Sequence, residues 1–480
     1  MDAPLRIAEL EAERDAERAR SQRLELQIGV LLEQVAALTA RVAALTERLG
    51  QNSRNSHLPP SSDPPGAGGK GSGPRRKSGR PRGGQRGHRG SHRELVAADK
   101  VDDVVDLYPA ECQNCWVPLP EQPDPDAKRS QWIEVPPLRP YIKETRRHEV
   151  TCLCCGHKTR AAYDDQEIPA SPFGPRLMSI VALLTGVYHV SRRRAAKLLS
   201  DLVGVPISLG AVSAVEARVS EAVQAPVAEA WQRVEGAPIK HTDGTTWLKA
   251  GVALALWTIA STAATVFKIV ADSSRATLAP LYGTLRGILV SDRAAALTFW
   301  AMERRQICWA HLLRKYVSFS ERAGPAGEIG RQLLDYTGLL FEYWHDYKAG
   351  KLDRATFLAW MAPVQAQVEA VLERAVASGI DRFAGSCANI LDHRAALWTF
   401  VYVDGVEPTN NHAERELRAF VLWRKRCFGT QSDRGNLFAE RLMTVGHTAR
   451  KQHKDVLSFL TACCQAQRDG TRAPSLFVAA

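Results

Sequence analysis

Apolar residues recur at alternating spacings of four and three near the start of the chain. The positions are Leu24, Ile28, Leu31, Val35, Leu38, Val42, Leu45 and Leu49. This is the heptad pattern of a coiled coil. β-Branched residues fill the a positions and leucines the d positions, which favours a parallel dimer. We therefore predict a coiled coil over residues 5–50 that pairs two subunits; the alternative is one amphipathic helix packed on its own domain.

A helical pattern returns from residue 171. Residues 191–223 predict a helix opened by Ser191, a turn at residues 204–206, and a second helix opened by Ser208. Two helices around a short glycine-containing turn outline a helix-turn-helix. The first helix carries basic residues suited to phosphate contacts, Arg192, Arg193 and Arg194. A DNA-binding region over residues 169–234 is one interpretation, and a purely structural helical pair is the other.

The period changes to that of strands after residue 236. Residues 238–251, 252–260 and 264–272 predict three successive strands, 276–285 a helix, and 287–292 a buried strand leading into another helix. This is the opening order of a ribonuclease-H-like α/β domain, in which the first and fourth strands lie side by side. The uncharged run 250–267 has the length of a membrane helix, but Ser and Thr residues interrupt it. A buried hairpin is the better interpretation, and no membrane partner is expected.

Two aspartates fall on the strands that this fold would pair. Asp243 lies within the first strand and Asp292 at the end of the fourth. Carboxylates so close repel one another unless a cation lies between them. Mg²⁺ or Mn²⁺ would bind through these carboxylates together with substrate phosphate oxygens, and two such ions would serve an in-line phosphoryl displacement. We predict a catalytic metal site at this edge of the sheet.

A third carboxylate should come from a helix beyond the next strand, which "ALWTFVYVDG" (residues 396–405) predicts. Glu414, within "PTNNHAERELRAF" (residues 408–420), is in the right place. Its rivals for the role are Asp404, Glu407 and Glu416.

A helix-terminus role for Glu414 is the alternative. Asn411 would be the N-cap, Glu414 its reciprocal partner, and Arg418 an i, i+4 ion-pair partner. The 122 residues between Asp292 and Glu414 also require an insertion. Its amphipathic periodicity predicts helices over residues 322–396.

The overall charge favours a polyanionic partner. The formal net charge is +11, and residues 66–93 hold ten glycines, nine Lys or Arg and no acid. We predict a disordered basic linker over residues 51–95, in which Arg80 and Arg82 could enter a minor groove; a merely solvated linker is the alternative. Further basic residues around Glu414 favour phosphate binding, with a merely solvated face as the alternative: Arg415, Arg418, Arg424 and Lys425.

Ten cysteines and a charged first stretch without a secretory pattern favour reduced thiols and a cytoplasmic protein. Two CxxC pairs, Cys112 with Cys115 and Cys152 with Cys155, are separated by 36 residues. They predict a four-thiolate structural zinc site in a ribbon-like module over residues 96–168. Residues 129–150 between the pairs look strand-forming, as such a module requires. Unliganded core cysteines are the alternative.

The chain resembles the transposases of insertion-sequence family 66, a branch of the D-D-E transposases, over essentially its whole length. The likeness rests on "NSRNSHLPPSSD", "GGQRGHRG", the paired CxxC segment, "CWAHLLRKY", and above all "PTNNHAERELRAFVLWRKRCFGTQSDRGNLFAERLMTVGHTARKQ". The resemblance implies a metal-dependent enzyme that cuts and joins DNA, acting on the element's ends and on target DNA. It implies Asp243 as the first aspartate, Asp292 as the second and Glu414 as the glutamate, and small accessory proteins as further partners.

The match has departures. The family often has Asp-Glu-Thr and Asp-Gly-Tyr at the two aspartates, where this chain has Gly244 after the first and Arg293 after the second. Thr409 stands where an Asp commonly precedes the paired asparagines. In related D-D-E enzymes a histidine at the position of His311 lies near the active site, so His311 is a candidate active-site neighbour or DNA contact, with a packed core histidine as the alternative. With Cys308 it forms a CxxH half-site whose two further metal ligands are not evident from the sequence.

The sequence thus predicts a multidomain, mostly α protein with an α/β core, located in the bacterial cytoplasm and nucleoid-associated when bound to DNA. The catalytic core comprises residues 235–321 and 397–462, followed by a tail over 463–480. Its predicted function is DNA transposition by metal-dependent strand cleavage and strand transfer. The rival prediction is a dimeric, zinc-containing DNA-binding regulator or a decayed transposase copy that no longer cuts.

Overall fold

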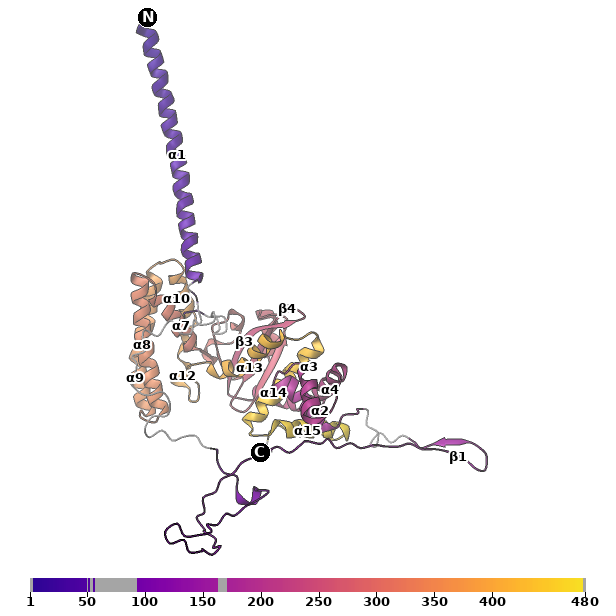
Figure 1. Cartoon of the computed structure of the whole chain (residues 1–480). Helices are drawn as coiled ribbons and strands as arrows, with labels where there is room; N and C mark the ends of the chain where they lie inside the picture. The colour runs from indigo at the N-terminus through magenta and orange to yellow at the C-terminus, as the bar shows by residue number, and fades with distance from the viewer. Residues whose placement is uncertain (1–2, 50, 52–54, 57–92, 163–170, 478–480) are drawn as a thin grey trace. The chain divides into compact units, whose positions relative to one another are not determined.

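The computed structural model describes residues 3–49, 51, 55–56, 93–162 and 171–477 (Figure 1). Two compact units make up the chain. One comprises Met1–Gly68, Pro169–Ser191 and Ser213–Ala480, and the other Gly69–Ile168 and Arg192–Val212. Arg80, Arg82 and most of the predicted basic linker lie outside the described residues. No helix in the described part of the chain is both long and apolar enough to cross a membrane.

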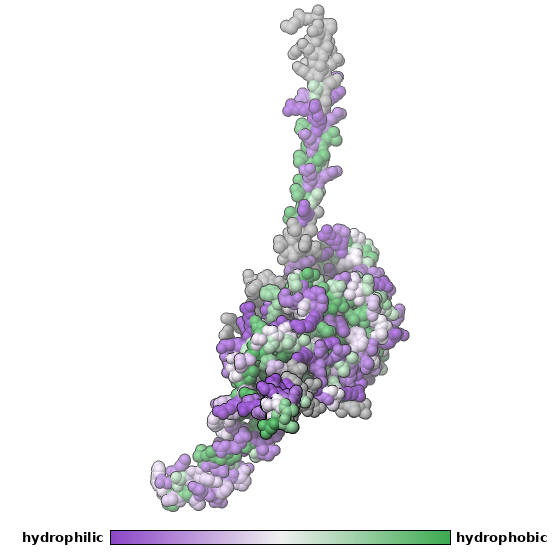
Figure 2. All heavy atoms as spheres, turned by 90° about the vertical axis from the view of Figure 1, so that its right-hand side faces the viewer, coloured by the Kyte–Doolittle hydropathy of each residue, from purple (hydrophilic) through white to green (hydrophobic). Residues whose placement is uncertain are grey.

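The heptad region forms one continuous helix, α1 (Ala3–Leu49). Its described a and d side chains are at least half exposed, from 50 % at Leu24 to 61 % at Val42. Figure 2 shows these apolar side chains interleaved with polar ones along the helix. Exposed leucine and valine at heptad spacing leave an apolar stripe that a second helix could cover.

A five-stranded sheet organises the larger unit. Its strands are β3 (Ile239–Lys249), β4 (Val252–Ala260), β5 (Thr265–Val270), β6 (Ile288–Ser291) and β7 (Arg305–Ile307). Their order is β5-β4-β3-β6-β7, antiparallel within β3–β4–β5 and parallel from β3 to β6 to β7. The uncharged run 250–267 is therefore a hairpin, as predicted, and the first and fourth strands are neighbours.

Two helices, α13 (Asn411–Cys427) and α14 (Asp433–Lys451), pack on the β3–β4–β5 half of the sheet (Figure 1). Their shared core is aromatic, with Trp247 and Phe267 of the sheet against Phe420 and Trp423 of α13. Burying four large rings at one interface is a strong stabilising contribution, because each removes a large apolar area from water.

Helix α14 also closes the open edge of the sheet. Three backbone N–H groups of β5 donate to side chains spaced four residues apart on α14, and an edge strand so satisfied cannot pair with another chain. The bonds are Thr265 N–H to Thr448 Oγ1 (3.1 Å), Phe267 N–H to Thr444 Oγ1 (3.2 Å) and Ile269 N–H to Glu440 Oε1 (2.6 Å).

The remaining helices precede the sheet or lie between its strands. The predicted helical pair is present as α3 and α4, and Ser208 Oγ accepts from Ala211 N–H (3.1 Å) at the start of α4. The elements are α2 (Pro175–Ala182), a π-turn (Leu183–Val187), α3 (Arg192–Val203), α4 (Leu209–Ala222), α5 (Gln224–Glu235), α6 (Arg275–Tyr282), α7 (Trp309–Ser320) and α15 (Val456–Arg468).

Between α7 and α13 in the sequence, the chain forms a layer of helices. Helices α8 (Pro325–Lys348) and α9 (Arg354–Ala377) lie side by side (Figure 1). They are followed by α10 (Phe383–Leu391), α11 (Arg394–Leu397) and α12 (Thr399–Tyr402). The predicted strand at 396–405 is wrong, because Trp398, Phe400 and Val401 are all buried in the core of this helical layer. A short apolar run has no periodicity that separates a strand from a buried helix.

Two further predictions of local structure are wrong. In the second unit, only Glu149 and Val150 of residues 129–150 belong to a strand, β1 (Glu149–Thr151), which pairs with β2 (Lys158–Arg160). Three prolines between residues 136 and 140 remove ladder donors there. After β6, the chain forms single 3₁₀ turns, Ala295–Leu297 and Met302–Arg304, instead of the expected helix.

We predict that Thr448→Val destabilises the sheet unit by about 1–3 kcal/mol, because Thr265 N–H loses its buried acceptor. Thr448 Oγ1 also donates to Thr265 O (3.0 Å). Urea unfolding measures the change. The matched control is Thr461→Val, whose hydroxyl bonds Leu457 O of its own helix; equal losses in the two variants would contradict the edge-closing role of α14.

Candidate active site

Parallel pairing of β3 with β6 brings two aspartates together. The register aligns Ile239 with Ile288 and His241 with Val290. Continued by two residues, it sets Asp243 beside Asp292, and side chains at equivalent positions of adjacent parallel strands point to the same face. Each carboxylate also accepts a nearby backbone N–H, from Gly244 (2.9 Å) and from Ala294 (3.0 Å). The strands that carry the two aspartates are therefore neighbours, as the sequence predicted.

The segment before α13 is fixed to both α7 and β3. Trp309 N–H donates to Pro408 O (2.9 Å), Asn410 N–H to Cys308 Sγ (3.1 Å), and Asn410 Nδ2 to Thr242 O (2.7 Å). Asn410 is fully buried, and its amide bonds the residue next to Asp243. This explains the paired asparagines better than capping does: the N-cap is Asn410, without a side-chain capping bond, so the prediction of Asn411 as the cap is wrong.

Glu414 lies in the first turn of α13, near enough to Asp243 for its charge to act on that carboxyl. Its Oε1 is 3.4 Å from Arg314 Nη2 and 3.6 Å from His311 Nδ1, both on α7. These are its ion-pair partners among the described residues, in place of the Arg418 expected from i, i+4 spacing. The structure thus places His311 beside Glu414, as an active-site neighbour would be.

The electrostatics of the three carboxylates favour a bound cation. Burial, followed by repulsion from Asp292 and Glu414, raises the pKa of Asp243 from 3.8 to about 8. The oxygens of Asp243, Asp292 and Glu414 do not all lie within 4.8 Å of one another. Among the described residues, the group of potential metal ligands that meets this distance is Cys308, His311 and Glu414. A hard cation would neutralise the carboxylates and draw them closer, so the donor set suits Mg²⁺ or Mn²⁺.

Two of the rival carboxylates face the helical layer. Asp404 is 3.5 Å from Arg354 and 3.3 Å from the Tyr347 hydroxyl. Glu407 is 3.2 Å from Lys348. Their partners all belong to α8 and α9, so neither competes with Glu414 for the aspartate pair.

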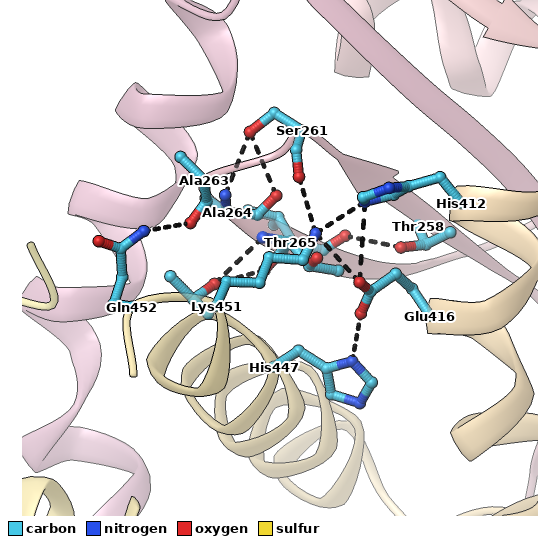
Figure 3. Close-up of polar contacts among 12 residues, drawn as sticks. Thr258, Ser261, Ala263, Ala264, Thr265, His412, Glu416, His447, Lys451 and Gln452 are labelled. Carbon is cyan, nitrogen blue, oxygen red and sulfur yellow. Dashed lines mark hydrogen bonds and ion pairs between the residues drawn. The ribbon is translucent and has the colours of Figure 1, made fainter. Parts of the chain in front are cut away.

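The third rival, Glu416, is bound on the opposite side of α13. It accepts a hydrogen bond from His447 Nδ1 and is 3.0 Å from Lys451 Nζ, and both of these residues lie on α14 (Figure 3). Lys451 also donates to Ser261 O (2.7 Å) in the β4–β5 turn and to His412 Nε2 (2.8 Å). Although burial raises the pKa of Glu416, the bond from His447 and the charge of Lys451 outweigh it and lower the pKa to about 2. This cluster fixes the rotation of α13, and with it the direction of Glu414.

Arg305 is a site residue that sequence reasoning missed. It is fully buried on β7 and donates to Asp292 O (2.8 Å) and Ser291 Oγ (3.1 Å), so it holds the turn that carries Asp292. Burial lowers its pKa to about 10. No local pattern marks it, because its role depends on β7 lying beside β6.

The two departures after the aspartates have structural counterparts. A Cβ on Gly244 would lie 2.8 Å from the Trp257 ring, so this indole occupies the space that a larger residue would need. Arg293 turns to the helical layer, where its Nη1 donates to Asn389 Oδ1 (2.7 Å). Burial lowers the pKa of Arg293.

The predicted DNA contacts differ in exposure. Arg415, Arg418 and Lys425 are exposed on α13. Arg424 instead reaches β3, where it donates to Thr246 O and, at 3.2 Å, to Thr245 Oγ1, which makes it a structural tie. The three arginines at the start of α3, Arg192, Arg193 and Arg194, are exposed.

Each CxxC pair of the second unit forms the same turn. Cys112 N–H donates to Val117 O and Trp116 N–H to Cys112 O, both at 2.9 Å. The second turn repeats these bonds at 2.8 Å, from Cys152 to His157 and from Gly156 to Cys152. Backbone N–H groups lower the pKa of the first thiol of each pair. Both turns are thus shaped for thiolates, but no three of Cys112, Cys115, Cys152 and Cys155 lie within 4.8 Å of one another, so their shared zinc stays a prediction.

The sheet and its carboxylates define an α/β protein with a half-buried acidic site suited to divalent-cation chemistry. The family comparison narrows this class: the model described as "Transposase IS66 family" matches residues 170–437, more than half of the 480-residue chain. The chain therefore belongs to the IS66 transposase family, which implies DNA transposition. A family of unknown function (DUF6444) matches residues 4–94. A search of curated proteins gave no match.

The Glu416 cluster predicts a specific pH dependence of stability. Because the pKa of Glu416 is lowered from 4.5 to about 2, its ionised form stabilises the fold fully above pH 4.5, and this contribution is lost as pH falls toward 2. Glu416→Gln should cost roughly 2–3 kcal/mol at neutral pH and clearly less at about pH 3. Urea unfolding at both pH values tests this, with the more exposed Glu407→Gln as the control. A pH-independent loss would contradict it.

The carboxylate cluster predicts a trade between stability and cation binding. Because the pKa of Asp243 is raised from 3.8 to about 8, its ionised carboxylate lowers the free energy of unfolding above pH 3.8, increasingly up to about pH 8. At pH 8 without divalent cations, Asp243→Asn should therefore be more stable than wild type by roughly 1–3 kcal/mol. Mg²⁺ should raise the melting temperature of wild type and leave that of Asp243→Asn nearly unchanged. A less stable variant in a chelating buffer would refute the repulsion.

Proposed function

We propose that this chain is a D-D-E transposase that cleaves DNA at the ends of its element and transfers the freed strand to target DNA. The observation that carries the proposal is that Asp243 on β3 lies in the electrostatic reach of two other acids, Asp292 directly after β6 and Glu414 on α13. Membership of the IS66 family and the ribonuclease-H-like strand order support it.

The three carboxylates would hold Mg²⁺ or Mn²⁺. The bound ions would activate the attacking water or 3′ hydroxyl and stabilise the leaving oxygen. Around them, Arg305 holds the Asp292 turn, Asn410 holds the start of α13 against β3, and Glu416 fixes the rotation of that helix. No side chain needs to form a covalent intermediate.

The other parts of the chain would bind and pair DNA ends. The exposed arginines of α3 and the exposed cations of α13 suit phosphate contacts. The two CxxC turns would close on one structural Zn²⁺, and the exposed heptad stripe of α1 would pair two subunits. Accessory proteins of the element would be further partners.

Strand cleavage and joining on labelled DNA that carries the element's ends tests the function, with Mg²⁺ or Mn²⁺ and with accessory proteins in a parallel set. Glu414→Gln, Asp243→Asn and Asp292→Asn should each reduce cleavage on the order of a thousandfold, because a metal ligand supports several kcal/mol of transition-state stabilisation. Asp404→Asn should cleave like wild type, since Asp404 faces the helical layer.

Binding of the same DNA is measured for every variant. If all proteins bind and wild type does not cut under any of these conditions, the chain is a DNA-binding regulator or a decayed copy. If Asp404→Asn loses cleavage and Glu414→Gln retains it, the third carboxylate is misassigned.

A further inference from the structure

Three side chains of different chemistry converge where α7 begins. Cys308 Sγ, a ring nitrogen of His311 and a Glu414 oxygen all lie within 4.8 Å of one another. Among the residues that the structure describes, no other three potential metal ligands from His, Cys, Asp and Glu lie this close together. The sequence shows only the CxxH half-site, and the third ligand comes from a position 103 residues beyond His311, on α13.

The donor set fits zinc. Sulfur, imidazole nitrogen and carboxylate oxygen are the three zinc ligand types, whereas Mg²⁺ takes oxygen almost alone. Tetrahedral zinc holds its ligands about 2.0–2.3 Å away, hence roughly 3.3–3.8 Å from one another. The 3.6 Å between His311 Nδ1 and Glu414 Oε1 is close to this, and the sulfur needs to approach by about 1.3 Å at most.

Burial raises the pKa of the Cys308 thiol to about 11, and backbone N–H groups around the sulfur oppose this in part. Cys308 is fully buried at the N-cap of α7, and Asn410 N–H donates to its Sγ at 3.1 Å. N–H donors and a helix N-terminus both favour negative charge on that sulfur. On binding, zinc would replace the thiol proton, which leaves to solvent. Three protein ligands leave a fourth position for water.

We propose that Cys308, His311 and Glu414 form an inhibitory zinc site, in which zinc draws Glu414 away from Asp243 and Asp292. The inhibitory half of this inference rests on the proposed function, because it needs Glu414 as the third ligand of the catalytic cation. The zinc-binding half does not. A carboxylate directed toward Cys308 cannot complete the all-oxygen site, so zinc and catalytic Mg²⁺ would compete for one side chain.

The binding half is tested on the full chain, freed of metal and titrated with Zn²⁺, and with Co²⁺ as a spectroscopic probe. Cys308→Ser keeps a hydrogen-bond acceptor for Asn410 N–H and should lower tight zinc by one ion per chain, leaving zinc at the CxxC pairs unaffected. His311→Gln should do the same. Cys387→Ser, which changes a buried cysteine of α10, is the matched control and should retain the wild-type number. An unchanged number in both Cys308→Ser and His311→Gln would overturn the site.

The inhibitory half is tested by Mg²⁺-dependent strand cleavage over a range of free zinc. Zinc that fills the site should reduce wild-type cleavage at least about tenfold, and Cys308→Ser should need at least about tenfold more zinc for the same inhibition. Zinc that fills the site and leaves cleavage unchanged, or stimulates it, would overturn the inhibition. Absence of cleavage even without zinc would overturn the proposed function and the inhibition together, while the zinc count would still decide the site.

Discussion

The parallel pairing of β3 with β6 is the constraint on which the rest of the structure depends. It places Asp243 and Asp292 side by side, where burial of Asp243 and then repulsion from Asp292 raise the pKa of Asp243. Such a cluster destabilises the fold unless other interactions hold its backbone in place, and two such interactions are present. Arg305 binds the turn after β6 from its far side, and Asn410 bonds the backbone of β3 next to Asp243. The repulsion is thereby stored in a rigid frame that a cation can relieve.

Helix α13 connects this frame to the rest of the unit through its different sides. Its apolar side, with Phe420 and Trp423, is buried against the sheet. Glu416 fixes the rotation of the helix against α14, which also closes the edge of β5. Glu414 lies on another side of the helix, where its charge acts on Asp243. The packing of Phe420 and Trp423 and the ion pair of Glu416 therefore set the orientation of Glu414, although none of these side chains needs to contact it.

Glu414 lies at the junction of two donor sets. With Asp243 and Asp292 it belongs to an all-oxygen set suited to hard cations, and with Cys308 and His311 to a mixed set suited to zinc. Both sets arise because the start of α7 and the segment before α13 are bonded to each other. In the proposed scheme, the metal that binds here would depend on which neighbours this one carboxylate approaches.

The sequence by itself determined the heptad helix, the hairpin of β4 and β5, and the candidacy of both aspartates, because each depends on a local period or on the place of a residue along one strand. It also singled out the segment around Glu414. Only the tertiary structure showed that Asp404, Glu407 and Glu416 have ion-pair partners elsewhere, that residues 396–405 form helices rather than the predicted strand, and that Glu414 lies beside Cys308 and His311. Those outcomes depend on contacts between residues far apart in the sequence, from 31 positions for Glu416 and His447 to 100 for Glu414 and Arg314. A period of two or 3.6 residues carries no information about what lies opposite.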